Sequence, residues 1–520
     1  MEEASPLLLN GASREVSGDN PEVENASMAW RLFLKESGRL WSIGIPIVFQ
    51  LLCIYGINAS TQILVGQVGE LQLAAISIGL SVIGNFAFGF LVIYILSGGG
   101  GGGWGSNMHG LCLQTTSCQI QLGMGSALET LCGQAYGAGQ VHMLGVYMQR
   151  SWIILLVCCL IMSPIYVFAG PILKLIGQEE DIAQLAGSFT ILIIPQLFSY
   201  AINFPVQKFL QAQSKVMVLA WIGLVALVLQ VFLVWLFIWV FGWDLAGAAV
   251  ALDISAWFIV VAQLVYVFGW CKDGWTGFSL MALNDIWAFV RLSLASAVML
   301  CLEVWYMMIL VLLTGYLNDA AIAVDALSIC MNINGWEFII FIGVNAAISV
   351  RISNELGSGH PRTAKFAVVT SIISSLLIGF FFMAVILIAR DYFAVLFTSS
   401  KEVQRVVTKL AYILAVTMVL NSVQPVISGI AIGGGWQALV AYINLGCYYV
   451  FGLPLGIILG YKLDLGVQGI WSGLLAGTIL QTLILIVILW RTDWKKEAAV
   501  SSKRVKTWGG QIEDELQVDT

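Results

Sequence analysis

The chain has 520 residues, of which 59% are hydrophobic and only 10% are charged. Soluble domains carry about 25% charged residues, so this composition excludes a soluble globular protein and predicts an integral membrane protein. The formal net charge of −6 is less informative than the placement of the charges. The ten cysteines include no CxxC pair and the three histidines fall in predicted loops. We therefore expect no disulfide framework, no metal site and no nucleic-acid partner.

Residues 1–39 precede the first apolar segment and are expected to form a disordered tail in the cytosol. No cleavable signal peptide is evident, because the first 30 residues are polar and acidic. Glu3, Leu7 and Leu8 fit the acidic dileucine pattern, in which an acidic residue stands four positions before a Leu-Leu pair. The pattern indicates a binding site for a sorting adaptor; the alternative is a chance match in a short acidic tail.

Apolar segments long enough for membrane helices follow from residue 40 onward, since about 20 residues span the hydrocarbon core of a bilayer. An all-α membrane fold is expected because helices satisfy their own backbone hydrogen bonds in lipid. We predict twelve transmembrane helices, at residues 40–64, 71–96, 144–168, 183–208, 216–241, 246–270, 286–314, 320–350, 364–389, 403–430, 437–461 and 467–490.

The basic residues predict the orientation of these helices. Placing both termini in the cytosol puts 18 of the 24 Lys and Arg residues on the cytosolic side and 6 on the opposite side. Such an excess is typical of cytosolic loops. We therefore expect a multi-pass protein with both termini in the cytosol, present as a monomer in membrane lipid.

Residues 123–139 recur weakly at 343–359, a shift of 220 residues. At the same shift Pro205 falls on Pro425, inside the fourth and tenth helices, and Asp244 falls on Asp464, before the sixth and twelfth. The structural landmarks of the repeat are Glu129, Gly137, Gly139, Gly357, Gly359, Pro205 and Pro425.

Equal spacing of these matches predicts two pseudo-symmetric six-helix lobes in the same orientation. The N-terminal lobe spans residues 40–270 and the C-terminal lobe spans 286–490. We expect a cytosolic linker at 271–285 and a cytosolic tail at 491–520.

The first lobe is expected to contain an insertion at about residues 91–121. Before residue 123 the best shift becomes 251, because Ser77 then aligns with Ser328 and Gly84 with Gly335. The segment contains six consecutive glycines, each of which costs a helix about 1 kcal/mol relative to alanine. The glycines do not form a P-loop, because this chain contains no Gly-Lys dipeptide. The insertion is either a flexible loop or retained non-coding sequence.

Carboxylates inside membrane helices are costly and are candidate functional residues. Glu303 lies near the centre of the seventh helix with no basic residue within ten positions, and Tyr306 shares its face. In an apolar cavity such a group is expected to hold a proton near neutral pH, which predicts a proton carrier. The alternative is a structural carboxylate held by hydroxyls and amides. Glu129 and Asp253 lie near helix ends, where we expect water to reach them.

The eighth helix is more polar than spanning requires. Asp325, Asn332 and Trp336 share one helical face, and Glu337 lies on another together with Asn334. This pattern predicts a cavity lining, although asparagines also join helices by hydrogen bonds. In the tenth helix, Asn421 and Gln424 stand beside Pro425, where a proline frees a carbonyl group and favours a kink. We predict a substrate cavity formed by Tyr306, Asn332, Trp336, Glu337, Asn421 and Gln424.

Several of these segments together resemble the multidrug and toxic compound extrusion (MATE) family, in its plant DETOXIFICATION branch, over about residues 35–495. The pieces that carry the resemblance are 126–139 (SALETLCGQAYGAG), 301–306 (CLEVWY), 328–336 (SICMNINGW), 351–357 (RISNELG) and 421–429 (NSVQPVISG). The resemblance implies twelve helices in two lobes that form a V, with alternating access by rocking. It also implies export of organic compounds from the cytosol, driven by inward H+ or Na+.

Glu303 matches the acidic position of the seventh helix that is thought to bind the proton in the family. Some plant members also have an acidic residue in the tenth helix, where this chain has Asn421 and Gln424, so Asp325 is the candidate for a second coupling residue. This variant resembles the subgroup that serves the vacuolar membrane.

The sequence thus predicts a proton-coupled antiporter that exports xenobiotics or metabolites such as flavonoids to the vacuole or the exterior, with H+ and no cofactor. The alternative is a channel-like anion uniporter of the vacuolar membrane. An enzyme is not expected, because no nucleotide motif and no large soluble domain are present.

Overall fold

Long apolar helices form nearly all of the described chain, which in this computed structural model comprises residues 18–22, 24–78, 116–175, 179–284, 286–315, 317, 320–398 and 400–509. Within these ranges, ten helices are long and apolar enough to cross a membrane, and one bent pair adds an eleventh span. These ranges contain no β-strand. The second predicted span, 71–96, falls largely outside the described residues.

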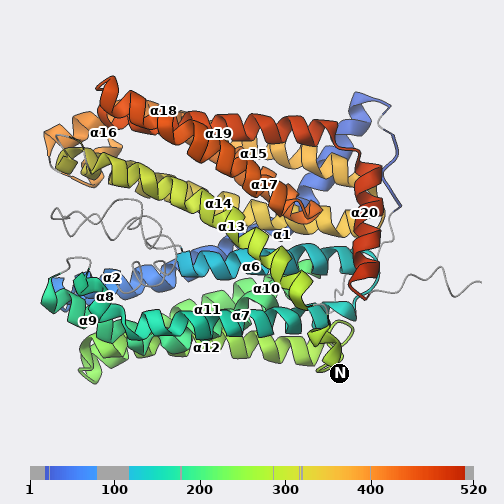
Figure 1. Ribbon diagram of the computed structural model, residues 1–520, viewed down its shortest axis with the longest axis horizontal. Coiled ribbons are helices and arrows are strands. Elements are labelled where there is room, and N and C mark those ends of the chain that lie inside the picture. The colour runs from blue at the N-terminus through green and yellow to red at the C-terminus, as the bar shows by residue number, and fades with distance from the viewer. Residues whose placement is uncertain are drawn as a thin grey trace, which may run out of the picture.

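The N-terminal lobe is built from α1 to α12; α6 to α12 form the lower half of the bundle in Figure 1, and the first part of α1 reaches the upper right. α1 is the longest of them, with 41 residues. The described helices of the N-terminal lobe are α1 (Ala26–Gly66), α2 (Glu70–Ile78), α6 (Thr116–Gly137), α7 (Met143–Val167), α8 (Ala169–Leu175), α9 (Glu180–Leu192), α10 (Ile194–Ala212), α11 (Val216–Trp235), the π-helix η2 (Leu236–Val240) and α12 (Asp244–Trp270).

The C-terminal lobe follows a linker that contains the short 3-10 helix η3 (Leu280–Leu283). Its helices are α13 (Ile286–Thr314), α14 (Ala320–Gly357), α15 (Pro361–Ala389), the 3-10 helix η4 (Phe393–Leu396), α16 (Lys401–Gly434), α17 (Gln437–Asn444), the π-helix η5 (Leu445–Gly452), α18 (Leu453–Ile457), the π-helix η6 (Ile458–Lys462) and α19 (Gly466–Arg491). The two lobes lie close together at one end and diverge toward the other (Figure 1).

A last helix, α20 (Trp494–Thr507), runs across the ends of the other helices where the lobes meet (Figure 1). Asp493 caps its N-terminus by accepting hydrogen bonds from the backbone N–H groups of Lys495 and Lys496. α20 packs against α14 and α15 of one lobe and α6 of the other. We call this end of the bundle, along which Trp494–Thr507 lies, the α20 face.

The predicted repeat is visible in the backbone. Gly139 and Gly359 are 220 residues apart and both adopt a left-handed conformation, with φ of 81° and 74°. Asp244 and Asp464 have the same relation, with φ of 51° and 54°. An L-residue with a side chain rarely adopts this conformation, so its recurrence at one shift confirms two repeated six-helix lobes. Pro205 and Pro425 lie inside α10 and α16, as predicted.

Three boundaries differ from the prediction. α1 begins at Ala26, so residues 26–39, expected as disordered tail, are helical; Glu36 of this part is buried against the C-terminal lobe. The fourth span bends by 46° between α9 and α10, whereas its repeat equivalent α16 is continuous. α6 begins at Thr116, so it includes the last residues of the predicted insertion; the preceding part of the insertion, 91–115, lies outside the described residues. Glu3, Leu7 and Leu8 also lie outside them.

Candidate functional site

Glu303 of α13 is surrounded by neutral hydrogen-bond donors from two other helices. The hydroxyl of Ser428 (α16) and the amide of Asn444 (α17) each donate to its Oε1 at 3.2 Å. The amide of Gln424, one turn before Ser428, donates to the Ser428 hydroxyl at 3.4 Å. No lysine, arginine or histidine of the described residues forms an ion pair with Glu303, whose hydrogen bonds come from these neutral groups.

A fourth helix, α19, fixes the orientation of Asn444, one of the donors to Glu303. Asn444 is fully buried, and its Oδ1 accepts a hydrogen bond from Nε2 of Gln481 on α19 at 3.2 Å. With its oxygen engaged by Gln481, the Asn444 side chain presents its NH2 group to Glu303. These hydrogen bonds favour the charged carboxylate, whereas its burial favours the neutral acid. Both printed bonds end on Oε1, so a proton can be held on Oε2 while Oε1 keeps its donors.

Sequence analysis did not single out Ser428, Asn444 or Gln481. The available signal was the occurrence of amides inside the apolar segments 437–461 and 467–490. Amides in membrane helices commonly join helices together, and these residues lie more than 120 positions away from Glu303. Only the packing of four helices brings them to the carboxylate.

Tyr306 lies in the helical core. Its hydroxyl donates to the Leu474 carbonyl at 2.7 Å, and its ring stacks on Tyr448 at a centroid distance of 4.4 Å. The ring is fully buried against Gly452 and Gly477, where a Cβ would overlap the Tyr306 hydroxyl. Tyr306 thus packs α13 against α19 and η5, away from the cavity described below.

The eighth predicted helix, α14, presents two different faces, as its sequence pattern indicates. Asp325 is exposed and Asn332 is partly exposed. Trp336 is 52% exposed and packs edge-on against Tyr55 of α1, with ring centroids 5.0 Å apart. Since α1 belongs to the other lobe, this face of α14 lies along the contact between lobes.

The second face of α14 is buried inside the C-terminal lobe. Asn334 accepts a hydrogen bond from the amide of Asn421 (α16) at 2.8 Å. Both residues line a small cavity between α13, α14, α16 and α19, together with Met307, Leu310, Met331, Thr417, Trp471, Leu474, Leu475 and Thr478. Of the residues predicted to form the substrate cavity, this cavity contains Asn421. Glu337 lies one turn from Asn334 and is only 2% exposed.

Glu129 in the N-terminal lobe is buried, with 3% exposure, so the expectation that water reaches it is wrong. Its Oε2 lies 2.6 Å from Nζ of Lys208 on α10. This ion pair lies within one lobe and neutralises a carboxylate that α6 would otherwise bury at high cost. Asp253 of α12 is partly buried.

Two of the landmark glycines, Gly137 and Gly357, lie where a helix of one lobe contacts a helix of the other. A Cβ at Gly137 (α6) would overlap the Asn354 carbonyl oxygen, and a Cβ at Gly357 (α14) would overlap the Gln134 carbonyl oxygen. Gly137 and Gly357 are repeat equivalents, and so are Gln134 and Asn354. The two helices therefore cross at their C-terminal ends about the pseudo-two-fold axis, and only glycine permits so close an approach.

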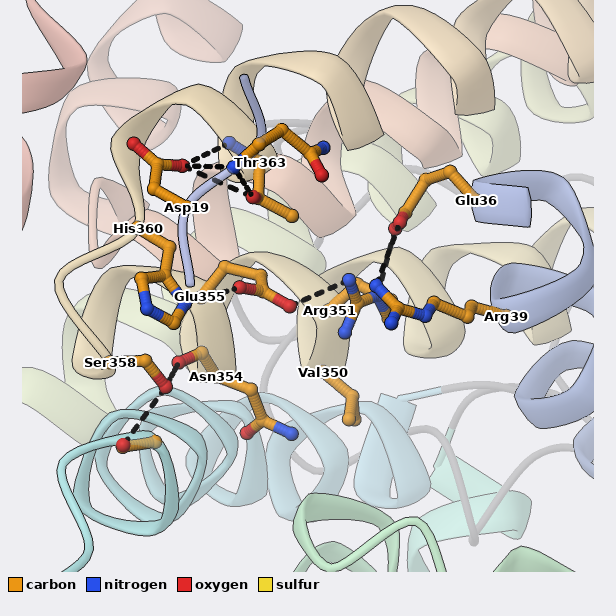
Figure 2. Close-up of polar contacts among 12 residues, drawn as sticks. Asp19, Glu36, Arg39, Val350, Arg351, Asn354, Glu355, Ser358, His360 and Thr363 are labelled. Carbon is orange, nitrogen blue, oxygen red and sulfur yellow. Dashed lines mark hydrogen bonds and ion pairs between the residues drawn. The ribbon is translucent and has the colours of Figure 1, made fainter. Parts of the chain in front are cut away.

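Hydrogen bonds reinforce this crossing on the α20 face. The Ser358 hydroxyl donates to the Gly137 carbonyl at 2.9 Å (Figure 2). Arg504 of α20 donates to Oε1 of Gln134 in one lobe and to the Gly434 carbonyl in the other. Burial lowers the pKa of Arg504. α20 thus joins the ends of α6 and α16 and holds the two lobes together at this face.

Beside the crossing, a chain of charges links α1 to α14. Nε of Arg351 lies 2.9 Å from Glu36 of α1, and its Nη2 lies 2.7 Å from Glu355 (Figure 2). His360, at the N-cap of α15, makes no capping bond. Asp19 caps the helix instead, because its carboxylate accepts hydrogen bonds from the backbone N–H and the hydroxyl of Thr363 (Figure 2). These contacts explain why the chain is ordered well before the first predicted span.

No group of three or more His, Cys, Asp and Glu side chains in the described ranges is placed to hold a metal ion. Many secondary transporters are built from two repeated helical lobes of this kind. The MatE family model matches residues 110–236 and 295–458, more than half of the chain, so the chain belongs to the MatE family.

The chain is 58% identical to Protein DETOXIFICATION 35 of Arabidopsis thaliana, over 98% of each protein. It is 56% identical to Protein DETOXIFICATION 34 of the same plant, over 98% of this chain and 88% of that protein. Among solved structures, the eukaryotic MATE transporter AtDTX14 superposes with a TM-score of 0.79 at 31% identity, covering 91% of this chain and 100% of that one. The Vibrio cholerae MATE transporter VcmN, at 17% identity and a TM-score of 0.74 over 90% and 100% of the chains, shares the fold.

Proposed function

We propose that this protein is a proton-coupled antiporter that exports organic compounds from the cytosol into the vacuole or to the exterior. The observation that carries the proposal is Glu303, a carboxylate deep in a membrane lobe that is held by neutral donors and paired with no cation. A proton is the charge that can neutralise such a group and then leave again. The α20 face is the cytosolic face, because 18 of the 24 basic residues fall on that side.

The coupling step is a change in hydrogen bonding at Glu303. Ser428 and Asn444 both donate to Oε1, and Asn444 is held in that orientation by Gln481. A proton that arrives from the acidic lumen and is held on Oε2 removes the charge that strengthens the hydrogen bonds at Oε1. Ser428 lies on α16, so protonation alters the contact between α13 and α16 and releases substrate from the cavity between them.

The substrate is an organic molecule with apolar or aromatic surface. The small cavity between α13, α14, α16 and α19 contains two methionines and Trp471, with Asn334, Asn421 and Thr478 as polar groups. Ligand sites are mostly apolar, with a few polar groups that fix orientation. The names of the DETOXIFICATION relatives support export of toxic compounds. The dileucine pattern at Glu3, Leu7 and Leu8 supports the vacuolar membrane.

The experiment is uptake into proteoliposomes with an imposed pH gradient, using ethidium and a flavonoid glucoside as probes. Wild-type protein should accumulate at least one probe when the lumen is acidic, and Glu303→Gln should not respond to the gradient. Glu402→Gln is the matched control, because Glu402 is an exposed residue in the first turn of α16. Undiminished gradient-driven uptake by Glu303→Gln contradicts the proposal. A chloride current that reverses at the chloride equilibrium potential and ignores pH identifies an anion uniporter instead.

A further inference from the structure

A second carboxylate of the C-terminal lobe, Glu337 of α14, lies completely inside the protein. Its side chain is 2% exposed, and neither Oε1 nor Oε2 has a hydrogen-bond partner among the described residues. An ionised carboxylate in such a place would cost several kcal/mol or more, and proteins avoid that cost by binding a proton instead. Glu337 is therefore a carboxylic acid in this conformation.

The helices packed against α14 bring no cation to Glu337. α15 has no titratable residue after Lys365, and α16 has none after Tyr412. The titratable groups on the other packed helices include Arg31, Lys35, Glu36, Arg39, Cys53 and Tyr55 of α1, Glu129, Cys132 and Tyr136 of α6, Arg291, Cys301, Glu303 and Tyr306 of α13, Tyr200 and Lys208 of α10, and Lys495, Lys496, Glu497, Lys503, Arg504 and Lys506 of α20. None of them is a partner of either Glu337 oxygen. Lys208 pairs with Glu129, Arg39 pairs with Glu36, and Arg504 bonds Gln134 and Gly434.

Two amides of α16 connect the surroundings of Glu337 to those of Glu303. Asn421 hydrogen-bonds Asn334, which lies one turn from Glu337 on the same face of α14. Gln424, one turn further along α16, donates to the Ser428 hydroxyl, which in turn donates to Glu303. Asn334 and Asn421 also line the C-terminal cavity. A movement of α16 that follows protonation of Glu303 thus opens the Asn334–Asn421 contact and brings the cavity to Glu337.

The two carboxylates lie on successive helices of one lobe. Glu303 lies eleven residues before the end of α13, and Glu337 lies seventeen residues after the start of α14. Both of these helix ends point away from the α20 face (Figure 1).

From these observations we infer that Glu337 is a second proton-binding residue of the C-terminal lobe, which carries its own proton in this conformation and loses it when α14 and α16 separate. This inference rests on the proposed proton antiport. Asp325, the other candidate from the sequence, is exposed on a different face of α14.

The first test is infrared spectroscopy of the purified full-length protein at pH 7.5, which detects the carbonyl stretch of protonated carboxyl groups directly. Glu337→Gln should remove one such band, and Asp325→Asn should leave the spectrum unchanged. Glu337→Asp should keep a shifted band, which separates loss of the proton site from loss of the fold. A spectrum of Glu337→Gln with the wild-type band overturns the inference, and so does a wild-type protein without the band.

The second test is the number of protons used for each molecule of probe. With the membrane potential clamped at zero and a gradient of one pH unit, two coupled protons allow about 100-fold accumulation of a neutral flavonoid glucoside, and one proton allows about 10-fold. We expect Glu337→Gln to retain uptake at the lower limit. Equal limits for both proteins contradict a coupled role. If Glu303→Gln keeps gradient-driven uptake, the proposed function fails, whereas the infrared band still tests the protonation of Glu337.

Discussion

The two lobes share a backbone design but treat their buried carboxylates differently. In the N-terminal lobe, Glu129 lies 2.6 Å from the ammonium group of Lys208. The repeat equivalent of Lys208, 220 residues later, is Ser428, whose hydroxyl donates to Glu303 in the C-terminal lobe. One position of the repeat therefore supplies a permanent cation in the first lobe and a neutral donor in the second.

This difference separates a structural charge from an exchangeable one. In this structure Lys208 neutralises the buried carboxylate of Glu129, so the charge of Glu129 is balanced without a proton. A serine neutralises nothing, so the net charge at Glu303 depends on a proton. The comparison shows that this position of the repeat leaves the nearby carboxylate without a cation only in the C-terminal lobe.

The largest expected effect on stability comes from replacing Lys208 of the N-terminal lobe by serine, the residue at the equivalent position 428 of the C-terminal lobe. In Lys208→Ser, Glu129 loses its partner inside the protein, and breaking a buried ion pair in this way costs about 3–5 kcal/mol of stability. The unpaired carboxylate can regain neutrality only by binding a proton, so the variant should be more stable at pH 5 than at pH 8. Thermal unfolding of the purified protein at the two pH values measures this.

The double variant Glu129→Gln with Lys208→Ser removes both charges and should recover most of the lost stability. Lys503→Ser serves as the control, since Lys503 is exposed on α20. A single Lys208→Ser protein that unfolds at the wild-type temperature at pH 8 would show that the pair does not stabilise this lobe.

The lobes are alike at the crossing of α6 and α14, where a second and smaller effect is expected. An added methyl group at Gly137 or at Gly357 would overlap a carbonyl oxygen of the opposite helix, and overpacking of this kind costs about 1–3 kcal/mol. Because the two glycines are equivalent, Gly137→Ala and Gly357→Ala should have similar effects and should force the lobes apart at the α20 face.

Maleimide labelling of Ser353→Cys reports this separation, because Ser353 is fully buried beside Gly133. Labelling should accelerate in both alanine variants and stay slow in Gly335→Ala, where a Cβ would meet no atom within 4 Å. A large acceleration in only one of the two variants would show that the crossing is not symmetric in solution.

The sequence alone predicted the repeat, because glycines and prolines that match at one shift can be found by comparing the chain with itself. It also predicted Glu303 as a site, since a carboxylate without a nearby basic residue stands out in an apolar segment. It could not predict Lys208 as the partner of Glu129, or Asn444 as a partner of Glu303. Those contacts join helices 79 and 141 residues apart in the chain, and they depend on how the helices rotate about their axes.

The helix at residues 26–39 was missed for a related reason. A hydropathy pattern identifies segments that cross lipid, and this part of α1 contains charges that pair outside the hydrocarbon core. Glu36 bonds Arg351, more than 300 residues later in the chain. Local sequence favoured a disordered tail there, and a tertiary ion pair on the α20 face overrides that preference.

The smallest expected change in stability tests the neutral ring in the second lobe. Ser428→Ala removes one hydrogen bond to Glu303, which is worth about 1 kcal/mol or less to the fold. The lost bond stabilises the charged carboxylate, so without it the proton binds more readily. The midpoint of the pH dependence of transport should therefore move to higher pH, by about 0.5–1 unit for a change of this size.

Uptake of the probe measured at a series of luminal pH values gives that midpoint. Ser422→Ala is the matched control, because its hydroxyl lies on the same helix and donates to the Val419 carbonyl of α16 itself. A midpoint that stays in place, or moves to lower pH, would show that Ser428 does not favour the charged form of Glu303. A shift in Ser428→Ala together with an unchanged Ser422→Ala would identify the position equivalent to Lys208 as the one that sets the proton affinity of the C-terminal lobe.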